Sequence, residues 1–146
     1  MTQFLYEKSV SDRGHLIVPF VQETVVGQPI YSYRLLSELG HKGKFHQSTN
    51  PADIYSGNLL KLIDAAKQHL AEHSDIKSNS DHFKSRYTYR HNLIIIYQAA
   101  DKYFYDHYPP TRLDNIAAPR LFKTEQECIL WVKRGLDRNY VKPVNL

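Results

Sequence analysis

A proline inside an apolar run constrains the fold of this chain most. Residues 15–20 read HLIVPF, and in a helix Pro19 would remove a hydrogen bond and clash with the preceding turn, at a cost of about 3 kcal/mol. The run is therefore predicted to be a strand. The stretch 24–28, which contains Gly27, is its turn, and a second strand ends near Leu36. Residues 15–36 are thus predicted to form a β-hairpin.

A similar order of side chains returns at residues 92–108, NLIIIYQAADKYFYDHY. Taken alone, this segment fits either an amphipathic helix or a hairpin that turns around residues 99–102. Residues 16–18 (LIV) match residues 93–95 (LII), and tyrosines follow the turn in both segments. Branched and aromatic side chains also favour strands over helices. The match therefore predicts a second hairpin over residues 92–108.

Each predicted hairpin precedes a predicted helix. In the first helix, near residues 57–73, one face is apolar. In the second, near residues 124–137, the sequence Thr124-Glu125-Gln126-Glu127 is a capping box, and Gly135 with the run after it indicates where the helix ends. The buried face of the first helix is predicted to comprise Leu59, Ile63, Ala66 and Leu70, and that of the second Cys128, Trp131, Val132 and Leu136.

These elements predict one compact α+β domain over residues 1–146, built from two ββα pseudo-repeats. The halves span residues 1–73 and 83–146, and the polar segment 74–82 joins them. Each half has only one helix to cover its strands, so the halves bury more surface by sharing one sheet or by packing sheet on sheet.

The order of hairpin, extended segment and helix resembles that of two kinds of small module. One is the sheet-reading DNA-binding domain with three strands and one helix, and the other is the tandem ββα protein of unknown role. The resemblance rests on element order and on the helix entry LFKTEQECILWV at residues 121–132. It implies a fold and assigns no residue a role, because one fold serves many functions.

Charge and cysteine content limit the environment and partners of the chain. Lysine and arginine outnumber aspartate and glutamate by 19 to 15, and this net charge of +4 permits an anionic partner. The single cysteine cannot form an internal disulfide, which is typical of a reducing compartment. No apolar run has the length of a membrane span or of a signal-peptide core. The chain is expected to be cytoplasmic, with no membrane partner.

The sequence contains no catalytic or cofactor-binding motif. The cysteine lies on the predicted buried face of a helix, and a strand would turn Asp106 and His107 to opposite faces. His69 and His73 have the helical spacing of two metal ligands, but Leu70 stands where the zinc motif requires glutamate. We therefore expect no catalytic residue, no metal and no cofactor, and the pattern favours a binding protein over an enzyme.

The leading functional hypothesis is a non-catalytic protein that contacts nucleic-acid phosphates. In FKSRYTYRHN, residues 83–92, an extended strand would place Lys84, Arg86 and Arg90 on one face and the aromatic side chains on the other. The alternative is a half-buried strand with aromatics inward and cations in water. The sequence HKGKFH at 41–46 adds Lys42 and Lys44, in either a phosphate-holding loop or a solubilising turn. These five cations form the predicted nucleic-acid site.

The predicted C-terminal helix carries a further basic group. Arg134 and Arg138 lie four residues apart on one face, with Lys133 nearby. Cations at the end of a helix interact favourably with its negative pole, so these residues need no ligand to explain them.

The alternative function is a protein-interaction or self-assembly module. Tyr103, Tyr105 and Tyr108 are predicted to form an exposed aromatic patch of the kind enriched at interfaces. Pro109 and Pro110 end the strand and leave its edge available to a protein partner or a second copy. The sequence leaves both functions open, as well as the choice between DNA and RNA.

Overall fold

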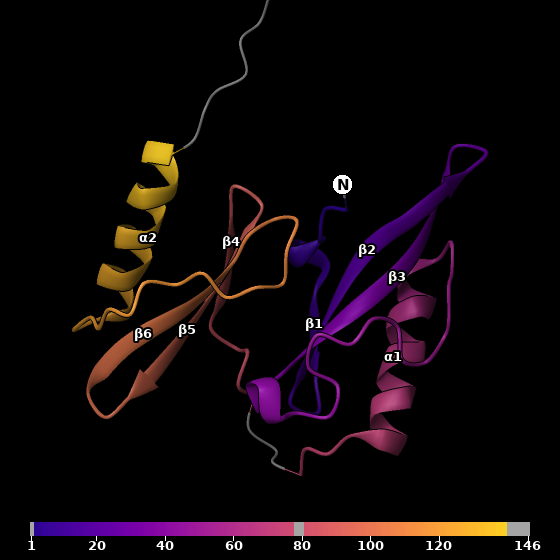
Figure 1. Ribbon diagram of the computed structural model, residues 1–146, viewed down its shortest axis with the longest axis horizontal. Coiled ribbons are helices and arrows are strands. Elements are labelled where there is room, and N and C mark those ends of the chain that lie inside the picture. Colours follow the sequence, from indigo (N-terminus) through magenta and orange to yellow (C-terminus); the bar gives the residue numbers. More distant parts are fainter. Residues whose placement is uncertain (1, 78–80, 140–146) are drawn as a thin grey trace, which may run out of the picture.

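The structure is a computed structural model that describes residues 2–77 and 81–139, and it is an α+β protein with two three-stranded antiparallel sheets and two helices (Figure 1). Each sheet is a meander followed by a helix. Short 3-10 helices, η1 (Tyr6–Lys8) and η2 (Gly40–Lys42), flank the first sheet. The first half contains β1 (Val10–Asp12), β2 (His15–Val25), β3 (Gln28–Ser37) and α1 (Leu59–His73), and the second contains β4 (Arg86–Tyr89), β5 (Asn92–Ala99), β6 (Lys102–Tyr108) and α2 (Glu125–Asn139).

Both predicted hairpins are confirmed, as β2–β3 and β5–β6. Each sheet also has a third strand ahead of its hairpin. β1 was not predicted, because three residues are too few to show a period of two. The turns that join β1 to β2 and β4 to β5 are each two residues long. Their residues, Arg13, Gly14, Arg90 and His91, all have positive φ. Such turns match the right-handed twist of the strands they join.

Pro19 is tolerated in β2 because its missing amide hydrogen would not face β3. The carbonyl of Pro19 accepts a hydrogen bond from the Leu5 amide at 2.9 Å, on the side of β2 away from β3. In a strand, the amide and carbonyl of one residue point to the same side, so the ladder between β2 and β3 loses no bond here.

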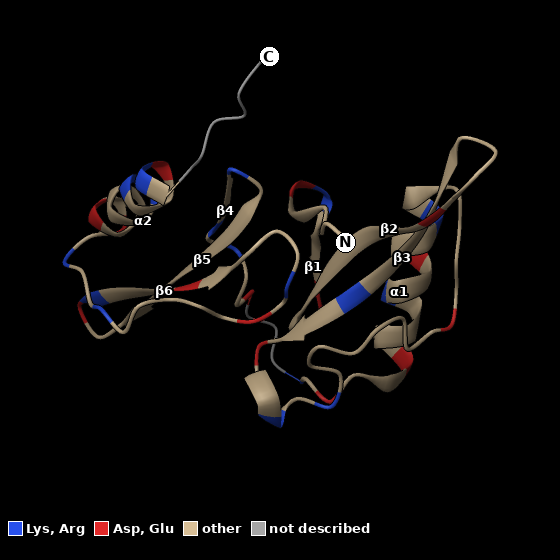
Figure 2. Ribbon diagram, turned by 45° about the horizontal axis from the view of Figure 1, so that its top comes forward, with Lys and Arg blue, Asp and Glu red and all other residues tan. Residues whose placement is uncertain are grey.

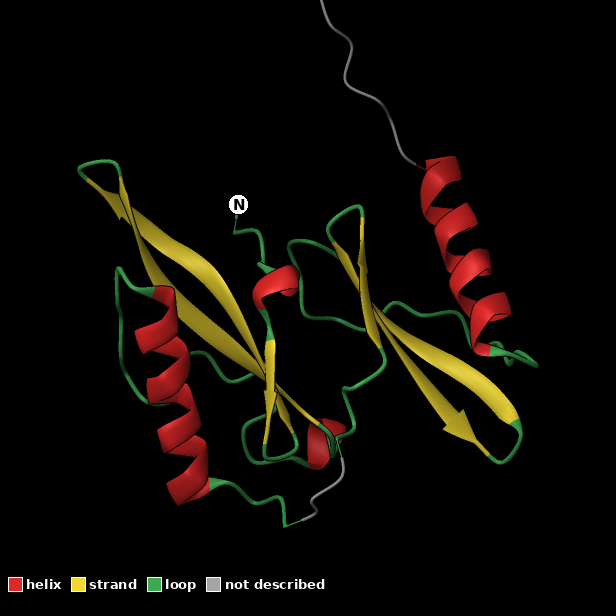
Figure 3. Ribbon diagram, turned by 180° about the vertical axis from the view of Figure 1, so that it is seen from behind, coloured by secondary structure: helices red, strands yellow, loops and turns green. Residues whose placement is uncertain are grey.

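The two sheets pack face to face, and each helix covers an outer face. Figure 3 shows α1 and α2 on the two outer sides of the molecule with the strands between them. Of the two arrangements expected from sequence, sheet-on-sheet packing is the one found. The first parts of β2 and β5 are therefore buried on both faces, which explains why HLIVPF and NLIIIY are continuous apolar runs instead of alternating ones.

Three buried clusters fill the layers. The middle one, here called the shared core, comprises Phe4, Tyr6, Leu16, Val18, Phe20, Leu36, Phe83, Leu93, Ile95, Tyr108 and Leu113. The outer clusters place Ile17 and Leu35 against Leu62 and Leu70 of α1, and Ile94 and Ile96 against Cys128 and Val132 of α2. The shared core draws on both halves of the chain, so the halves depend on each other for burial.

Hydrogen bonds also cross the seam between the halves. The Phe4 amide donates to the carbonyl of Pro110 at 2.8 Å, and the Tyr6 hydroxyl donates to the carbonyl of Pro109. The Gln47 side chain donates to the carbonyl of Leu113 at 2.6 Å. These bonds satisfy carbonyls of the segment after β6 that would otherwise lie unpaired beside the apolar seam.

The helix starts follow local sequence. The Asn58 side chain accepts the Lys61 amide at 3.1 Å and caps α1. At α2, the Thr124 hydroxyl accepts the Glu127 amide at 3.1 Å, as the capping box predicts, but the Glu127 carboxylate accepts the Lys123 amide instead of the Thr124 amide. α2 extends to Asn139, two residues beyond the predicted end near residue 137, and Gly135 lies inside the helix.

The single cysteine gives a direct test of α2 packing. Cys128 is fully buried, and burial raises the pKa of its thiol to about 11. We therefore expect the native protein to react far more slowly with a thiol reagent at neutral pH than the unfolded chain does. Cys128→Ala should lower the free energy of unfolding by about 1 kcal/mol, because it removes one small buried side chain. Fast labelling of the native protein would contradict this packing.

Because the shared core contains residues from both halves, we expect the two halves to unfold together. Ile95 is fully buried in it, and Ile95→Ala should lower the free energy of unfolding by about 3 kcal/mol. Urea unfolding would be followed by Trp131 fluorescence, which reports on the second half, and by circular dichroism, which reports on both. The two transitions should coincide in the wild type and in the variant.

The matched control is Ile54→Ala, because Ile54 is 38% exposed in the loop before α1. This change should alter the free energy of unfolding by no more than about 0.5 kcal/mol. Separate transitions for the two probes would show that the halves fold independently.

Candidate functional site

A small cavity lies between the two halves, and two carboxylates form part of its wall. Its volume is about 180 Å³. The first half contributes residues from the end of β3 and the loop that follows it, and the second half contributes residues from β5, β6 and the segments beside them. The lining residues are Ser37, Glu38, Gly40, His41, His46, His82, Phe83, Tyr97, Asp106, Tyr108 and Asn115.

Strand alternation places the central side chains of this cavity. Asp106 on β6 lies directly opposite Ile95 on β5, and directly opposed residues point to the same face of a sheet. Because Ile95 belongs to the shared core, Asp106 also points between the sheets. Tyr97 and Tyr108 are each two residues away along their strands and share this face. The neighbouring His107 points to the other face, as predicted from the sequence.

The Asp106 carboxylate accepts three hydrogen bonds. The Tyr97 hydroxyl donates to Oδ2 at 3.0 Å and the Tyr108 hydroxyl donates to the same oxygen at 3.2 Å. The Asn115 amide donates to Oδ1 at 2.8 Å. Burial raises the pKa of Asp106, and these three donors oppose the rise. Burial and the adjacent carboxylate also raise the pKa values of both tyrosines, which therefore remain protonated donors.

Three histidines also line this cavity. The His82 ring stacks on Tyr97, with centroids 4.4 Å apart and planes at 32°. In the first half, His46 Nδ1 accepts the Ser37 amide at 3.0 Å, and the His41 ring meets His46 edge-on at 5.1 Å. Burial lowers the pKa values of His46 and His82 below the usual histidine value, so both are neutral at pH 7. Among the described residues that line the cavity, none is lysine or arginine.

The strand in this segment is shorter than the predicted extended stretch 84–90, so Lys84, Arg86 and Arg90 do not lie along one strand. β4 begins only at Arg86, so Lys84 precedes the strand, and Arg90 lies in the β4–β5 turn. The Arg86 guanidinium instead donates to the carbonyls of Phe83 at 2.8 Å and Ser9 at 3.3 Å. The reason is that this side of β4 faces the first sheet, where an arginine serves to satisfy buried carbonyls.

The aromatic residues of the same segment point inward only in part. Phe83 is buried in the shared core, as predicted. Tyr87 packs beneath α2 and its hydroxyl donates to Glu125 at 3.0 Å. Tyr89 lies at the edge of the sheet, where its hydroxyl donates to the Asp137 carboxylate at 2.7 Å.

A basic group forms where the β4–β5 turn meets the end of α2. Arg90 Nε donates to Asp137 at 2.7 Å, and the cations of Arg90 and Lys133 lie 5.5 Å and 5.2 Å from the centre of the Tyr89 ring. Figure 2 shows lysine and arginine both at this turn and along α2. We call Arg90, Lys133, Arg134 and Arg138 the α2 basic group.

Lys42 and Lys44 belong to a different surface. They lie in and after η2, at the opposite end of the molecule from the β4–β5 turn (Figure 1). The Lys44 amide donates to the Asp75 carboxylate at 2.8 Å, and its ammonium lies 5.0 Å from the Phe45 ring centre. A protein carboxylate thus occupies an amide that a phosphate-holding loop would offer to its ligand. The structure does not bring the five predicted cations together.

The prediction of an exposed tyrosine patch is wrong, because two of its three tyrosines are buried. Tyr105 and Tyr108 are only 6% and 5% exposed, because β6 lies between the first sheet and α2. The edge of β6 is covered as well, since Tyr103 and Phe122 exchange backbone hydrogen bonds at 2.8 Å in both directions. The role of these tyrosines in a protein interface remains a prediction.

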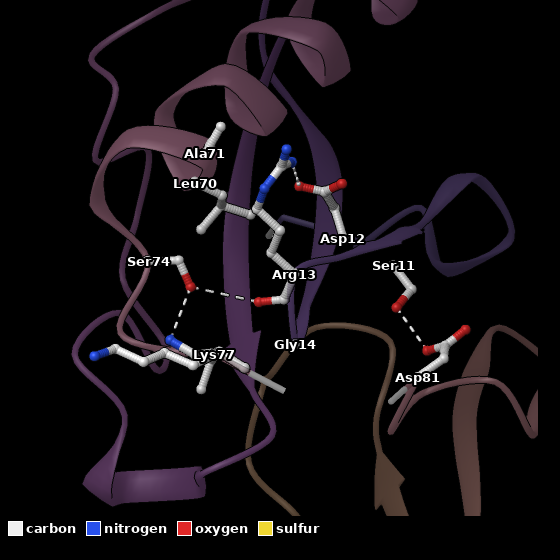
Figure 4. A pocket seen from close by; sticks show the side chains of 10 residues that line it. Ser11, Asp12, Arg13, Gly14, Leu70, Ala71, Ser74, Lys77 and Asp81 are labelled. Atoms are coloured by element: carbon white, nitrogen blue, oxygen red, sulfur yellow. Dashed lines mark hydrogen bonds and ion pairs between the residues drawn. The ribbon is translucent and has the colours of Figure 1, made fainter. Parts of the chain in front are cut away.

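A second hollow, of about 470 Å³, lies beside the β1–β2 turn (Figure 4). Its polar groups bind one another. The Ser74 hydroxyl donates to the carbonyl of Arg13 at 3.5 Å, and the Ser11 hydroxyl donates to Asp81 at 2.8 Å. These bonds tie the two described ends of the predicted connector 74–82 to β1 and to the turn that follows it, and residues 78–80 of the connector lie outside the described part. The bonds account for the polar groups without a ligand.

The histidine pair on α1 is stacked, with His69 and His73 ring centroids 4.6 Å apart. Within residues 2–77 and 81–139, no three histidine, cysteine, aspartate or glutamate side chains converge in a way that would hold a metal ion. Neither described helix combines the length and hydropathy needed to cross a membrane.

Comparison of the chain with models of protein families, with curated proteins and with solved structures found no match.

The sequence did not predict this cavity, although strand alternation shows which of its residues share a face. Asp106 was considered only together with His107, as an acid–base pair. Its true neighbours, Tyr97 and Tyr108, occupy positions of matching parity across the hairpin, so their common face follows from the register. His46 and His82 come from irregular segments, and no periodic pattern places such segments in space.

The histidine pKa values predict a loss of stability in mild acid. Because the folded-state pKa values of His46 and His82 are lowered, the unfolded chain binds more protons below about pH 6.5. The free energy of unfolding should therefore be highest above that pH and fall as pH drops toward the folded-state values. Urea unfolding at about pH 7.5 and about pH 5 measures the loss.

The variant His46→Asn retains an acceptor for the Ser37 amide but cannot gain a proton. It should lose less stability than the wild type between the two pH values, and the comparison cancels the contributions of Asp106 and the other histidines. The control is His91→Asn, an exposed turn position at φ 64° that asparagine tolerates. An equal loss in wild type and His46→Asn would contradict the assignment.

Proposed function

We propose that this chain is a small non-catalytic binding protein that contacts nucleic-acid phosphates through the α2 basic group. One observation carries the proposal: Arg90 from the β4–β5 turn and Lys133 from α2 both act on the Asp137 carboxylate, and Arg134 and Arg138 lie beside them on the last turns of the same helix. Arg90 is retained from the cations predicted by sequence. Arg86 is set aside because it binds carbonyls in the seam, whereas Lys42, Lys44 and Lys84 lie on other parts of the surface.

The charge distribution along α2 supports this choice. Its first turn carries Glu125 and Glu127, and its last turns carry the cations, so an anionic chain is attracted to one end only. The helix dipole alone accounts for cations on the last turns. It does not account for Arg90, which arrives from the β4–β5 turn. The convergence of a second element on the same end is what favours a ligand.

The contact is with phosphates and not with bases. The Tyr89 ring has cations near it from both Arg90 and Lys133, and its hydroxyl is engaged by Asp137, so we assign it no stacking role. Binding through phosphates alone is weak, tolerant of sequence and steeply dependent on salt.

A second candidate function, interaction with a protein partner, is favoured by the tip of the β2–β3 hairpin. This hairpin projects beyond the rest of its sheet (Figure 1). Val26 at its tip is 95% exposed and has a φ of 50°, a left-handed conformation that a branched side chain rarely adopts. Strained backbone conformations cluster at functional sites, so this exposed apolar tip is a candidate contact surface. This surface replaces the tyrosine edge as the place to test for a partner or a second copy.

The nucleic-acid proposal predicts the effect of reversing two exposed charges. Arg134→Glu combined with Arg138→Glu should weaken binding of labelled single- and double-stranded oligonucleotides by at least about tenfold at about 50 mM salt. The wild type should lose affinity steeply between about 50 and about 200 mM salt, and the variant should show a flatter dependence. Fluorescence anisotropy measures both quantities.

The matched control is Lys61→Glu combined with Lys67→Glu, which changes the net charge equally but on α1. It should leave affinity within about threefold of the wild type, because exposed charges more than a Debye length away are screened. Circular dichroism checks that all variants fold. Absence of wild-type binding at low salt, or an equal effect of both double variants, would contradict the proposal and favour the protein-interaction candidate.

A further inference from the structure

We infer that the cavity between the two sheets is a binding site for a primary ammonium group, held by the Asp106 carboxylate and by the aromatic rings around it. The inference is independent of the α2 basic group, which lies on the outer side of the second sheet.

The charge of the cavity calls for a cation. Its wall contains two carboxylates, Asp106 and Glu38, and no lysine or arginine among the described lining residues. Neither carboxylate has a salt-bridge partner within the described part of the chain. Both carboxylates are half-buried, and a negative charge partly removed from water without a cation carries a desolvation cost, even when it accepts hydrogen bonds. A positively charged ligand would remove this cost.

The hydrogen bonds already made by Asp106 select the kind of cation. A carboxylate offers about four acceptor positions. Tyr97 and Tyr108 use two on one oxygen, and Asn115 uses one on the other. About one position remains, which suits a single N–H of an ammonium group. A guanidinium group binds carboxylates through two parallel bonds and would have to displace one of the existing donors.

The remaining walls suit an ammonium group as well. The rings of Phe83, Tyr97, Tyr108 and His82 all line the cavity, and aromatic faces attract cations. Its volume of about 180 Å³ is several times that of one water molecule, which is roughly 30 Å³. The site therefore has room for an ammonium head with a short alkyl stem, but not for a large ligand.

The test is an NMR titration of the intact chain at about pH 7.5, where His46 and His82 are neutral. The probes are n-butylammonium, which carries one ammonium group, and agmatine, which carries an ammonium group and a guanidinium group on one butyl chain. A third probe is agmatine acetylated on its amine, which keeps only the guanidinium group. We expect n-butylammonium to shift the resonances of Tyr97, Tyr108, His82 and Asn115 saturably. The acetylated agmatine should bind at least about threefold more weakly, because it offers only the guanidinium group.

Asp106→Asn should reduce the affinity for n-butylammonium by at least about tenfold, because it removes the charged acceptor. Glu38→Gln, on the opposite half, should reduce it by about threefold and provides a second test if the first variant does not fold. The control Asp64→Asn removes an exposed carboxylate on α1 and should leave the affinity unchanged. Absence of saturable shifts, unchanged affinity in both cavity variants, or tighter binding of acetylated agmatine would overturn the inference.

A further arm identifies the source of the ammonium group. The peptide acetyl-Gly-Lys-Gly-amide presents a lysine side chain without other charges. Binding tighter than that of n-butylammonium would assign the site to a lysine of a partner protein, and weaker binding would assign it to a free amine. The variant Arg134→Glu with Arg138→Glu should bind n-butylammonium like the wild type, so this test and the oligonucleotide test fail separately.

Discussion

The face-to-face packing of the two sheets is the constraint on which the rest of this structure depends. Over residues 15–20 of β2 and 92–96 of β5, neither central strand has a solvent-exposed face, because one face packs on the other sheet and the opposite face packs on a helix. A three-stranded sheet with one helix is a small unit with little apolar surface to bury. Joining two such units through the shared core adds a third apolar layer, and it makes the burial of each half depend on the other.

The same packing creates the cavity. Where the sheets meet, most inward positions are apolar, but the period of two also carries Asp106 and the tyrosine hydroxyls to the inner face. A carboxylate at that position is costly to a purely structural seam, since an apolar residue of similar size would pack there without desolvation. The seam instead surrounds the carboxylate with donors and aromatic rings from β5 and β6, and histidines from the loops of both halves line the same cavity.

The two proposed binding surfaces have opposite charge and separate positions. The α2 basic group lies on the outer side of the second sheet and is open to a long anionic chain. The cavity lies inside the seam and accepts only a small cationic group. A ligand in the cavity contacts both halves at once, because His41 and His46 come from the first half and Tyr97 and Asp106 from the second. Its binding is thereby linked to the packing of the halves, and stabilises the folded state by mass action.

The local elements of this protein were determined by the sequence itself. Pro19 excluded a helix at 15–20, the matching run at 92–108 identified the second hairpin, and Thr124 marked the start of α2. Each of these depends on neighbours within a few residues, where backbone sterics and capping bonds decide the conformation. The period of two also separated Asp106 from His107 correctly.

Only the tertiary structure decided what each face of a strand meets. Alternation shows which residues share a face but not whether water, a helix or a second sheet covers it. For this reason Arg86, expected in water, binds carbonyls in the seam, and Tyr105, expected at an exposed edge, is buried beneath α2. The cavity around Asp106 depends in addition on irregular segments far apart in the chain. Their positions follow from the packing of the two sheets, and no local pattern encodes that packing.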